Sequence, residues 1–197
     1  MQLPDRLRLP FSFDPERLAG DLASLSMVRW IEHFVQDNYE GDWSVIPLRS
    51  KAGAKHPIMM IFSDPGCREF EDTPMLAACP YYREVLATFK APLHAVRLMR
   101  LTAGSVIKEH ADHDLSFERG MVRLHSPVMT NPHVEFYLNR ERVELDAGSC
   151  WYLRLADPHS VVNRGGTDRV HMVIDAEAND WVADVLQQAV GRHPAPS

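Results

Sequence analysis

The feature that most constrains the fold is a change of pattern at His94, after which short β-prone runs alternate with turn residues up to Asp175. The turns fall at 103–105, 131–132, 146–148 and 165–168. Many short strands with regular turns are typical of a β-sandwich or jelly roll. The predicted strands are Ala95–Thr102, Val106–His110, Met121–Met129, Val134–Leu138, Arg142–Leu145, Cys150–Leu155, Ser160–Asn163 and Arg169–Asp175. We therefore expect a mainly β fold with flanking helices, a double-stranded β-helix (jelly roll, cupin-like).

Helical signals flank this region. Asp14 can cap a helix whose first position suits Pro15, and leucines then recur at helical spacing. Further helices are predicted at 80–89, where apolar residues form a stripe, and at 180–190. These helices are expected to pack on the outside of the β-structure.

The length and composition are those of one domain. The chain has 197 residues, of which 45% are hydrophobic, and this is enough for a single full core. Within a single domain, 1–197, we expect a helical, substrate-side part at 1–93 and the jelly-roll core at 94–176. A C-terminal helix and tail should occupy 177–197.

Charge, hydropathy and cysteine content argue against several classes of protein. A net charge of −6 without a long Lys/Arg run disfavours a nucleic-acid partner. No apolar run approaches the ~20 residues of a membrane span, and the first residues lack the apolar core of a signal peptide. Cys67, Cys79 and Cys150 form no CxxC pair, which disfavours a disulfide framework or a zinc knuckle. We expect a reduced, soluble, cytoplasmic protein; its oligomeric state is not indicated.

Two short motifs carry candidate metal ligands. Two histidines and one carboxylate, His110, Asp112 and His159, would leave three positions of an octahedral iron open, as in the facial triad of non-heme Fe(II) oxygenases. His110 and Asp112 are two residues apart, so on an extended strand both side chains point to the same face. His159 would come from a later strand and complete the site. His113 and Asp114 follow at once, and spacing alone does not exclude them as ligands.

An arginine follows the second motif. Arg169 lies ten residues after His159 and offers a fixed fork that suits a carboxylate held bidentately. Alternation places Arg123 with His125 on one strand face, and Arg169 with His171 on another. A half-buried strand with that face in water would show the same pattern, but both strands lie next to candidate ligands. We therefore expect a polar barrel interior, in which an open metal site and a carboxylate clamp indicate an oxygenase that consumes 2-oxoglutarate.

These residues carry a family resemblance. From Val96 to Asp175 the chain resembles the aspartyl/asparaginyl β-hydroxylase family of 2-oxoglutarate- and Fe(II)-dependent oxygenases, and it is similar to the bacterial free-proline hydroxylases that share this fold. The matching segments are Gly104–Asp112, Val122–His125, Gly148–Leu153, Pro158–Ser160 and Arg169–Asp175. The half before them matches weakly, through Trp43 and Leu48-Arg49.

The resemblance implies roles for individual residues. The implied iron ligands are His110, Asp112 and His159. Arg169 would hold the distal carboxylate of 2-oxoglutarate, and Arg123 and His125 fall where the family places further cosubstrate contacts. The best-known animal members lack the acidic ligand, so Asp112 makes this chain look more like the bacterial small-molecule branch. The remaining histidines are expected at the surface or in structural roles: His33, His56, His94, His133 and His193.

The expected function is hydroxylation of an amino acid or an amino-acid-like side chain with Fe(II), 2-oxoglutarate and O2, giving succinate and CO2. A lipid or natural-product hydroxylase with the same cofactors is an alternative. Two further alternatives are a non-catalytic cupin-like binding protein and a cupin-type dioxygenase that needs no cosubstrate. No Gly-x-Ser-x-Gly elbow and no glycine-rich phosphate loop is present to indicate other chemistry.

Recognition of the substrate is the least determined part. The candidate residues are Trp43, Arg49, Arg97 and Arg100. Arg97 and Arg100 have opposite parity, so at most one of them should face inward on a regular strand. For each arginine the alternative is a solvated position. The loops 51–57 and 113–120 are candidate lids, because both are polar and irregular.

Overall fold

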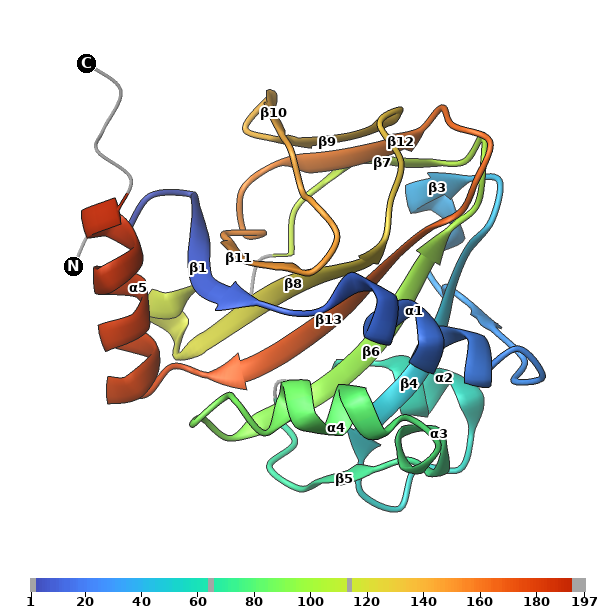
Figure 1. Ribbon diagram of the computed structural model, residues 1–197, viewed down its shortest axis with the longest axis horizontal. Coiled ribbons are helices and arrows are strands. Elements are labelled where there is room, and N and C mark those ends of the chain that lie inside the picture. The colour runs from blue at the N-terminus through green and yellow to red at the C-terminus, as the bar shows by residue number, and fades with distance from the viewer. Residues whose placement is uncertain (1–2, 64–65, 113–114, 193–197) are drawn as a thin grey trace.

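The computed structural model describes residues 3–63, 66–112 and 115–192, in which two antiparallel sheets face each other (Figure 1). The larger sheet contains, in order, β1 (Arg6–Ser12), β11 (Ser149–Leu153), β8 (Met121–Met129), β13 (Arg169–Glu177), β6 (Leu93–Leu101), β4 (Trp43–Lys51) and β2 (Ile31–Glu32), with β5 (Phe70–Asp72) beside β4. The smaller contains β10 (Glu141–Val143), β9 (Val134–Leu138), β12 (His159–Asn163), β7 (Val106–His110) and β3 (Tyr39–Glu40). The mainly β jelly-roll prediction is confirmed.

Four of the described helices cover the outer face of the larger sheet: α1 (Pro15–Ser24), α3 (Pro74–Ala77), α4 (Pro80–Leu86) and α5 (Asp180–Arg192). A fifth, α2 (Pro57–Ile61), packs on the cavity side, where Ile61 joins the apolar cluster that contains Trp43 and Met99. The short 3-10 turns are η1 (Gln36–Asn38) and η2 (Phe117–Arg119). Asp14 caps α1 as predicted, because its carboxylate accepts from the N–H groups of Glu16 and Arg17. Among the described helices, none combines the length and apolar character needed to cross a bilayer.

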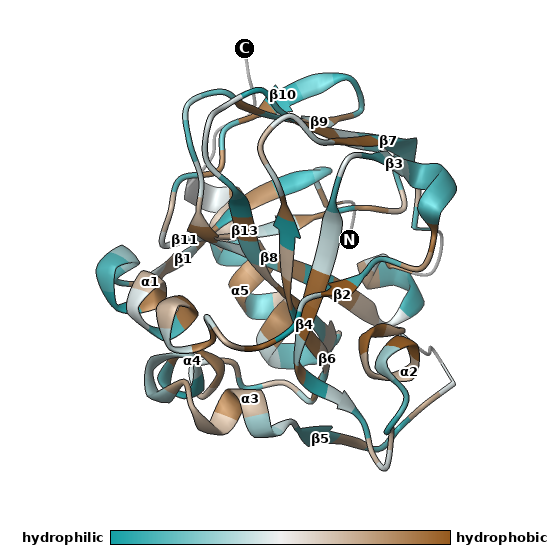
Figure 2. Ribbon diagram, turned by 90° about the vertical axis from the view of Figure 1, so that its right-hand side faces the viewer, coloured by the Kyte–Doolittle hydropathy of each residue, from teal (hydrophilic) through white to brown (hydrophobic). Residues whose placement is uncertain are grey.

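Alternation along the central strands divides the interior into two parts. Residues on one face of β8 and β13, such as Val122, Leu124 and Met172, join the main apolar core under the helices. The helices show both brown and teal surfaces in Figure 2, as amphipathic helices do. The opposite face of the same strands points between the two sheets and carries the polar residues. The predicted polar barrel interior is therefore present.

The predicted division at residue 94 is corrected. The segment 1–93, expected to be helical, supplies β1, β2, β4 and β5 to the larger sheet and β3 to the smaller one. β4 does not show the alternation of a half-buried strand, because nearly all its residues are buried. The jelly roll therefore draws on both halves of the chain, while the predicted tail after Arg192 lies outside the described residues.

Two β-bulges reset which way side chains point. On β7, His110 pairs with His159 while Ile107 pairs with Val161, so β7 has one extra residue. Both residues in between are exposed, and His110 returns to the inner face that Ile107 occupies. On β4 a similar shift follows Pro47.

Candidate active site

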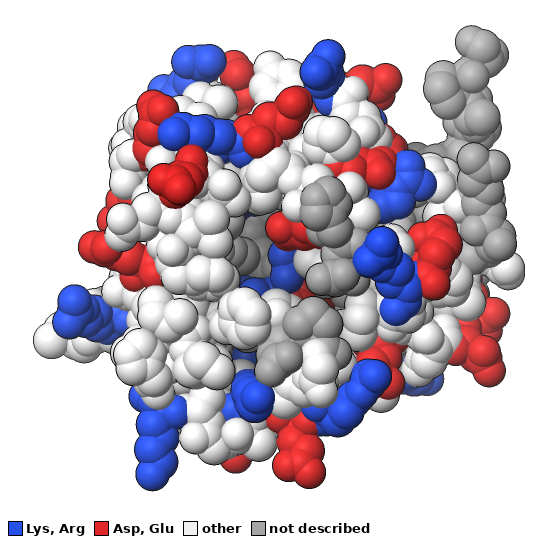
Figure 3. Space-filling model, turned by 180° about the vertical axis from the view of Figure 1, so that it is seen from behind, with Lys and Arg blue, Asp and Glu red and all other residues white. Residues whose placement is uncertain are grey.

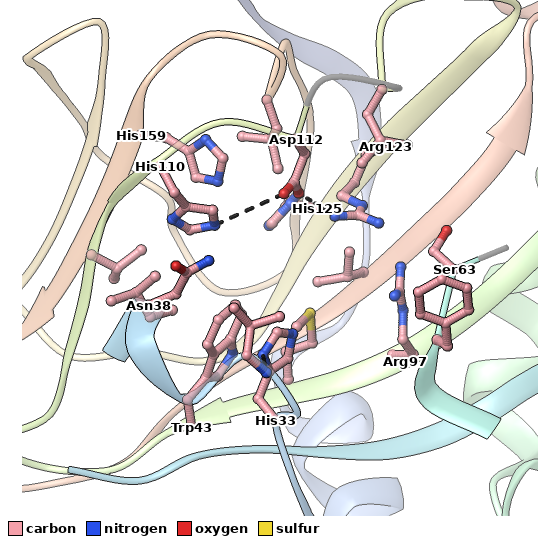
Figure 4. Close-up of a pocket in the computed structure, with 18 of the residues that line it drawn as sticks. His33, Asn38, Trp43, Ser63, Arg97, His110, Asp112, Arg123, His125 and His159 are labelled. Atoms are coloured by element: carbon pink, nitrogen blue, oxygen red, sulfur yellow. Dashed lines mark hydrogen bonds and ion pairs between the residues drawn. The ribbon is translucent and has the colours of Figure 1, made fainter. Parts of the chain in front are cut away.

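The three predicted metal ligands come together at the end of the barrel. The ligand atoms of His110, Asp112 and His159 all lie within 4.8 Å of one another (Figure 4). The two histidines are direct cross-strand partners on β7 and β12, with ring centroids 4.3 Å apart. β7 ends at His110, so Asp112 lies in the following loop rather than on the predicted shared strand; its N–H donates to the carbonyl of Leu155 at 2.7 Å.

Two further candidate ligands follow Asp112 in the sequence. His113 and Asp114 lie outside the described residues. The described cluster is complete without them, since it supplies two imidazoles and one carboxylate. This donor set, next to a cavity, fits an iron(II) ion with open positions.

Backbone carbonyls fix the protonation pattern of both ligand histidines. Nδ1 of His110 lies 2.8 Å from the carbonyl oxygen of Lys108, and Nδ1 of His159 lies 3.0 Å from that of Asp157. A carbonyl only accepts, so each Nδ1 carries the proton and each Nε2 keeps a free lone pair. Burial, and then the nearby His110, lower the pKa of His159 to about 4. The imidazole is therefore neutral near pH 7, as metal ligation requires.

A cavity of about 260 Å³ lies beside these ligands, between the two sheets. Figure 3 shows a hollow in the surface with basic atoms inside it, within a rim that is mostly uncharged. The predicted site residues that line the cavity are Trp43, Arg97, His110, Asp112, Arg123, His125, His159 and Arg169. The structure thus brings together residues from β4, β6, β7, β8, β12 and β13.

Arg123 connects the metal ligands to a buried ion cluster. Its Nη1 donates to Asp112 at 2.6 Å, and its Nε and Nη2 donate to Asp175 at 2.6 and 3.0 Å. Asp175 is fully buried and also accepts from Arg97 and from the hydroxyl of Ser63. Burial alone would raise the pKa of Asp175, but the two guanidiniums hold it well below its usual range. The charge of Arg123 is therefore shared between two protein carboxylates, one of which is a metal-ligand candidate.

Arg169 has a different environment. It is 2% exposed, and burial lowers the pKa of its guanidinium to about 9, which still leaves it charged near pH 7. Its one side-chain hydrogen bond within the described residues runs from Nη2 to Nδ1 of His171, at 2.7 Å, and its Nε is buried without a partner. No described carboxylate pairs with it. A buried cation without an anion is costly, so this part of the cavity is suited to a bound anion.

The arginines on β6 divide as their parity predicts. Arg97 faces the cavity, pairs with Asp175 and donates to the carbonyl of Ile61 at 3.2 Å. Arg100 faces away, lies over the ring of Trp30 and does not line the cavity. The expectation that Arg100 contacts the substrate is therefore corrected, whereas Arg97 remains a candidate for substrate recognition.

The expectation for Arg49 is also corrected. Because β4 has an extra residue after Pro47, Arg49 pairs with Val96, which belongs to the outer core. Its guanidinium is held by Asp72 and by the carbonyls of Leu93 and Phe70. The loop 51–57 does not line the cavity either. Of the second candidate lid, Leu115 lines it.

Several lining residues were not predicted. His33 stacks on Trp43 with ring centroids 3.6 Å apart, and burial, followed by the charge of Arg97, lowers the pKa of His33 to about 4. His94 also lines the cavity, so neither histidine is merely at the surface, whereas His193 lies outside the described residues. The other unpredicted lining residues include Phe34, Asn38, Phe62 and Ser63. No periodic pattern marks these positions, because most of them lie in short connections.

Known proteins place this geometry in a family. The family model for aspartyl/asparaginyl beta-hydroxylases matches residues 16–179. The L-proline cis-4-hydroxylase of Rhizobium meliloti (strain 1021) is 26% identical over 177 residues, which cover 89% of this chain and 61% of that protein. The L-proline cis-3-hydroxylase 2 of a Streptomyces species is 26% identical over 171 residues, covering 82% of this chain and 56% of that protein. The chain therefore spans less than two thirds of the length of these relatives.

A solved structure shares the fold. The oxidoreductase of the 2OG-Fe(II) oxygenase family from Burkholderia pseudomallei superposes with a TM-score of 0.56 at 14% identity, covering 89% of this chain and 86% of that one. At this identity the likeness concerns the fold alone. The family match, in contrast, covers most of the sequence and includes every candidate ligand. The chain belongs to the aspartyl/asparaginyl beta-hydroxylase family.

Proposed function

We propose that the protein is a 2-oxoglutarate- and Fe(II)-dependent hydroxylase of an amino acid or an amino-acid-like side chain. The observation that carries this proposal is the meeting, in one cavity, of a two-histidine, one-carboxylate ligand set with the unpaired cation of Arg169. Family membership supports it, and the curated relatives are named as hydroxylases of L-proline. The cytoplasmic location and the lack of a nucleic-acid partner stay predictions.

The ligand set defines what the chain contributes at the metal. His110, Asp112 and His159 would hold the iron, His110 and His159 through Nε2 atoms whose lone pairs are left free by Nδ1–H···O=C bonds. When bound, iron would couple the oxidation of 2-oxoglutarate by O2, to succinate and CO2, with insertion of an oxygen atom into a substrate C–H bond. Arg123 orients the Asp112 carboxylate through the hydrogen bond at 2.6 Å.

Cosubstrate and substrate would bind at separate arginines. Arg169 is proposed to pair with the distal carboxylate of 2-oxoglutarate, because its guanidinium is buried and no carboxylate among the described residues pairs with it. Arg97 is proposed to receive a carboxylate of the substrate, because it faces the cavity, shares the single Asp175 carboxylate with Arg123, and has an Nε that is buried without a partner among the described residues. The stacked pair of His33 and Trp43 forms an aromatic wall that would exclude water from the bound substrate.

The first experiment removes the metal ligands. We expect His110→Ala and His159→Ala to abolish substrate-stimulated succinate formation across a panel of free amino acids and peptides, and to weaken Fe(II) binding measured by anaerobic calorimetry. His133→Ala, at an exposed position away from the cavity, is the matched control. Full activity of His159→Ala would exclude this ligand set.

A second experiment addresses the substrate. Arg97→Ala should lose stimulated turnover while keeping the slow decarboxylation of 2-oxoglutarate that occurs without substrate. Arg100→Ala should retain both rates, since this residue faces away from the cavity. If Arg97→Ala keeps normal coupling on the true substrate, a neutral natural product becomes the better candidate. If the wild-type protein makes no succinate with any compound tested, a binding protein or a cosubstrate-free dioxygenase is favoured.

A further inference from the structure

We infer that His171 is a positioning residue that holds the Arg169 guanidinium in place as a neutral hydrogen-bond acceptor and so leaves its positive charge available to a ligand. This inference rests on the proposed function, in which Arg169 meets the distal carboxylate of 2-oxoglutarate. It assigns a role in cosubstrate binding to His171, which does not itself line the main cavity.

The contact is local and buried. Arg169 and His171 are alternate residues on the inner face of β13, exposed by 2% and 1%. The hydrogen bond of 2.7 Å from Nη2 to Nδ1 is the polar contact that the described residues offer to the Arg169 side chain. A long arginine side chain has many rotamers, so losing this bond would free the guanidinium to move.

The direction of the bond defines the state of the imidazole. A guanidinium only donates, so Nδ1 of His171 accepts and the proton sits on Nε2. This Nε2 has no hydrogen-bond partner in the part of the chain that the structure describes, and His171 borders a second cavity of about 410 Å³ near the turn between β8 and β9. Burial, and then the charge of Arg169, keep the pKa of His171 well below its usual range, so the ring is neutral.

A carboxylate would serve poorly at this position. Four residues further along the same face of β13, Asp175 pairs with Arg97 and Arg123 and balances much of their charge. An aspartate at 171 would do the same to Arg169 and compete with any incoming carboxylate. An imidazole makes a comparable hydrogen bond without adding a negative charge.

Three substitutions separate orientation, charge and packing. His171→Asn keeps a neutral acceptor near the position of Nδ1, His171→Leu keeps volume without an acceptor, and His171→Asp keeps an acceptor but adds charge. Met172→Leu, on the opposite face of β13 in the apolar core, is the matched control for altered packing. The dissociation constant of 2-oxoglutarate would be measured by calorimetry on Mn(II)-loaded protein, and that of glutarate, which lacks the keto group, on metal-free protein.

We expect affinity for both dicarboxylates to fall about tenfold in His171→Leu and about a hundredfold in His171→Asp, because hydrogen bonds and pairing at charged groups have effects of this size. His171→Asn should stay within about threefold of wild type, since a neutral acceptor is kept. Mn(II) affinity and the KM of the amino-acid substrate should not change. If folded His171→Leu binds both dicarboxylates with wild-type affinity, His171 does not position the Arg169 guanidinium. If His171→Asp binds them with wild-type affinity, the neutrality of His171 does not matter for binding.

One readout does not involve the cosubstrate. Nitrogen-15 NMR of metal-free protein should show His171 as the neutral tautomer with its proton on Nε2. A proton on Nδ1 would overturn the inference even if the enzyme consumes 2-oxoglutarate. Conversely, wild type and the His171 variants could bind glutarate with the predicted order of affinities while the wild-type protein forms no succinate. That outcome would contradict the proposed function and leave the inference standing.

Discussion

Arg123 and Arg169 line the same cavity and are almost equally buried, at 8% and 2% exposure, yet their surroundings are opposite. Arg123 bridges two carboxylates, Asp112 and Asp175, whereas the one hydrogen bond of the Arg169 side chain within the described residues goes to the neutral ring of His171. Burial alone therefore does not identify a ligand-binding arginine. The distinguishing property is whether the protein itself supplies the counter-charge, because the cation that it leaves unpaired is the one that an anion can stabilise.

The largest expected effect is at the buried ion cluster of Asp175, Arg97 and Arg123. Asp175→Asn removes the carboxylate that Arg97 and Arg123 share and leaves two buried guanidiniums close together. Removing one partner of a buried ion pair costs about 3–5 kcal/mol, so the free energy of unfolding should fall by about that amount. Urea denaturation of the metal-free protein measures it, with Ser63→Ala as a milder change at the same carboxylate. A loss below about 1 kcal/mol would mean that the cluster is not compensated as described.

The converse change at Arg169 should separate stability from binding. Arg169→Met removes an unpaired buried cation, so the metal-free protein should be as stable as wild type or more stable. The affinity for 2-oxoglutarate should nevertheless fall at least tenfold, because hydrogen bonds to charged groups contribute ~1.5–3 kcal/mol. Arg169→Lys should also bind less tightly, because it lacks the fork. An unchanged KM for 2-oxoglutarate in Arg169→Met would place the cosubstrate elsewhere.

Acid should reduce the stability contributed by His33 and by Asp175 in different pH ranges. Burial lowers the pKa of His33 from 6.5 to about 4, so protons bind the unfolded chain first and the stability contributed by neutral His33 is lost as pH falls from 6.5 towards 4. Asp175, whose pKa lies below its ordinary 3.8, loses its contribution only at still lower pH. Unfolding free energies of metal-free protein across this range should show both phases. His33→Gln should reduce only the upper one, and an unaltered upper phase would assign it to other groups.

The smallest expected effect is at an arginine that is compensated and lies outside the cavity. Arg49 pairs with the largely exposed Asp72, so Arg49→Ala should change the free energy of unfolding by less than about 1 kcal/mol. The KM values for 2-oxoglutarate and substrate should stay at wild-type level. A kinetic defect in a folded Arg49→Ala protein would show that the cavity extends further than the structure indicates.

Strand alternation predicted much of this arrangement, and the two bulges mark where it could not. Regular parity placed Arg123 with His125 and separated Arg97 from Arg100, as the structure has them. Counting along β7 from Ile107 would have turned His110 outward, but the extra residue on that strand turns it in. A single inserted residue has little sequence signature, so the positions that it re-aims must be seen in the fold.

Other parts of the site depend on contacts distant in the sequence. Asp175 could have been noticed as an acidic residue on the same face of β13 as Arg169 and His171, but nothing in the sequence shows that Arg97, 78 residues earlier, is its partner. His33 and Ser63 come from short connections without periodicity, and the closure of the barrel brings them to the cavity. Sequence patterns thus predicted the strands, and which candidate ligands lie together, better than the network that joins them.

The carbonyl contacts of the two ligand histidines have a consequence for how this cavity can evolve. Each Nδ1 is held by a main-chain oxygen two residues earlier in the same chain segment, from Lys108 and from Asp157. Main-chain groups persist whatever side chain is substituted, so no mutation of a neighbouring side chain deletes either acceptor. Substitutions at neighbouring positions therefore leave the tautomers of both imidazoles unchanged. The walls of the cavity can diversify towards new substrates without retuning the metal ligands at each step.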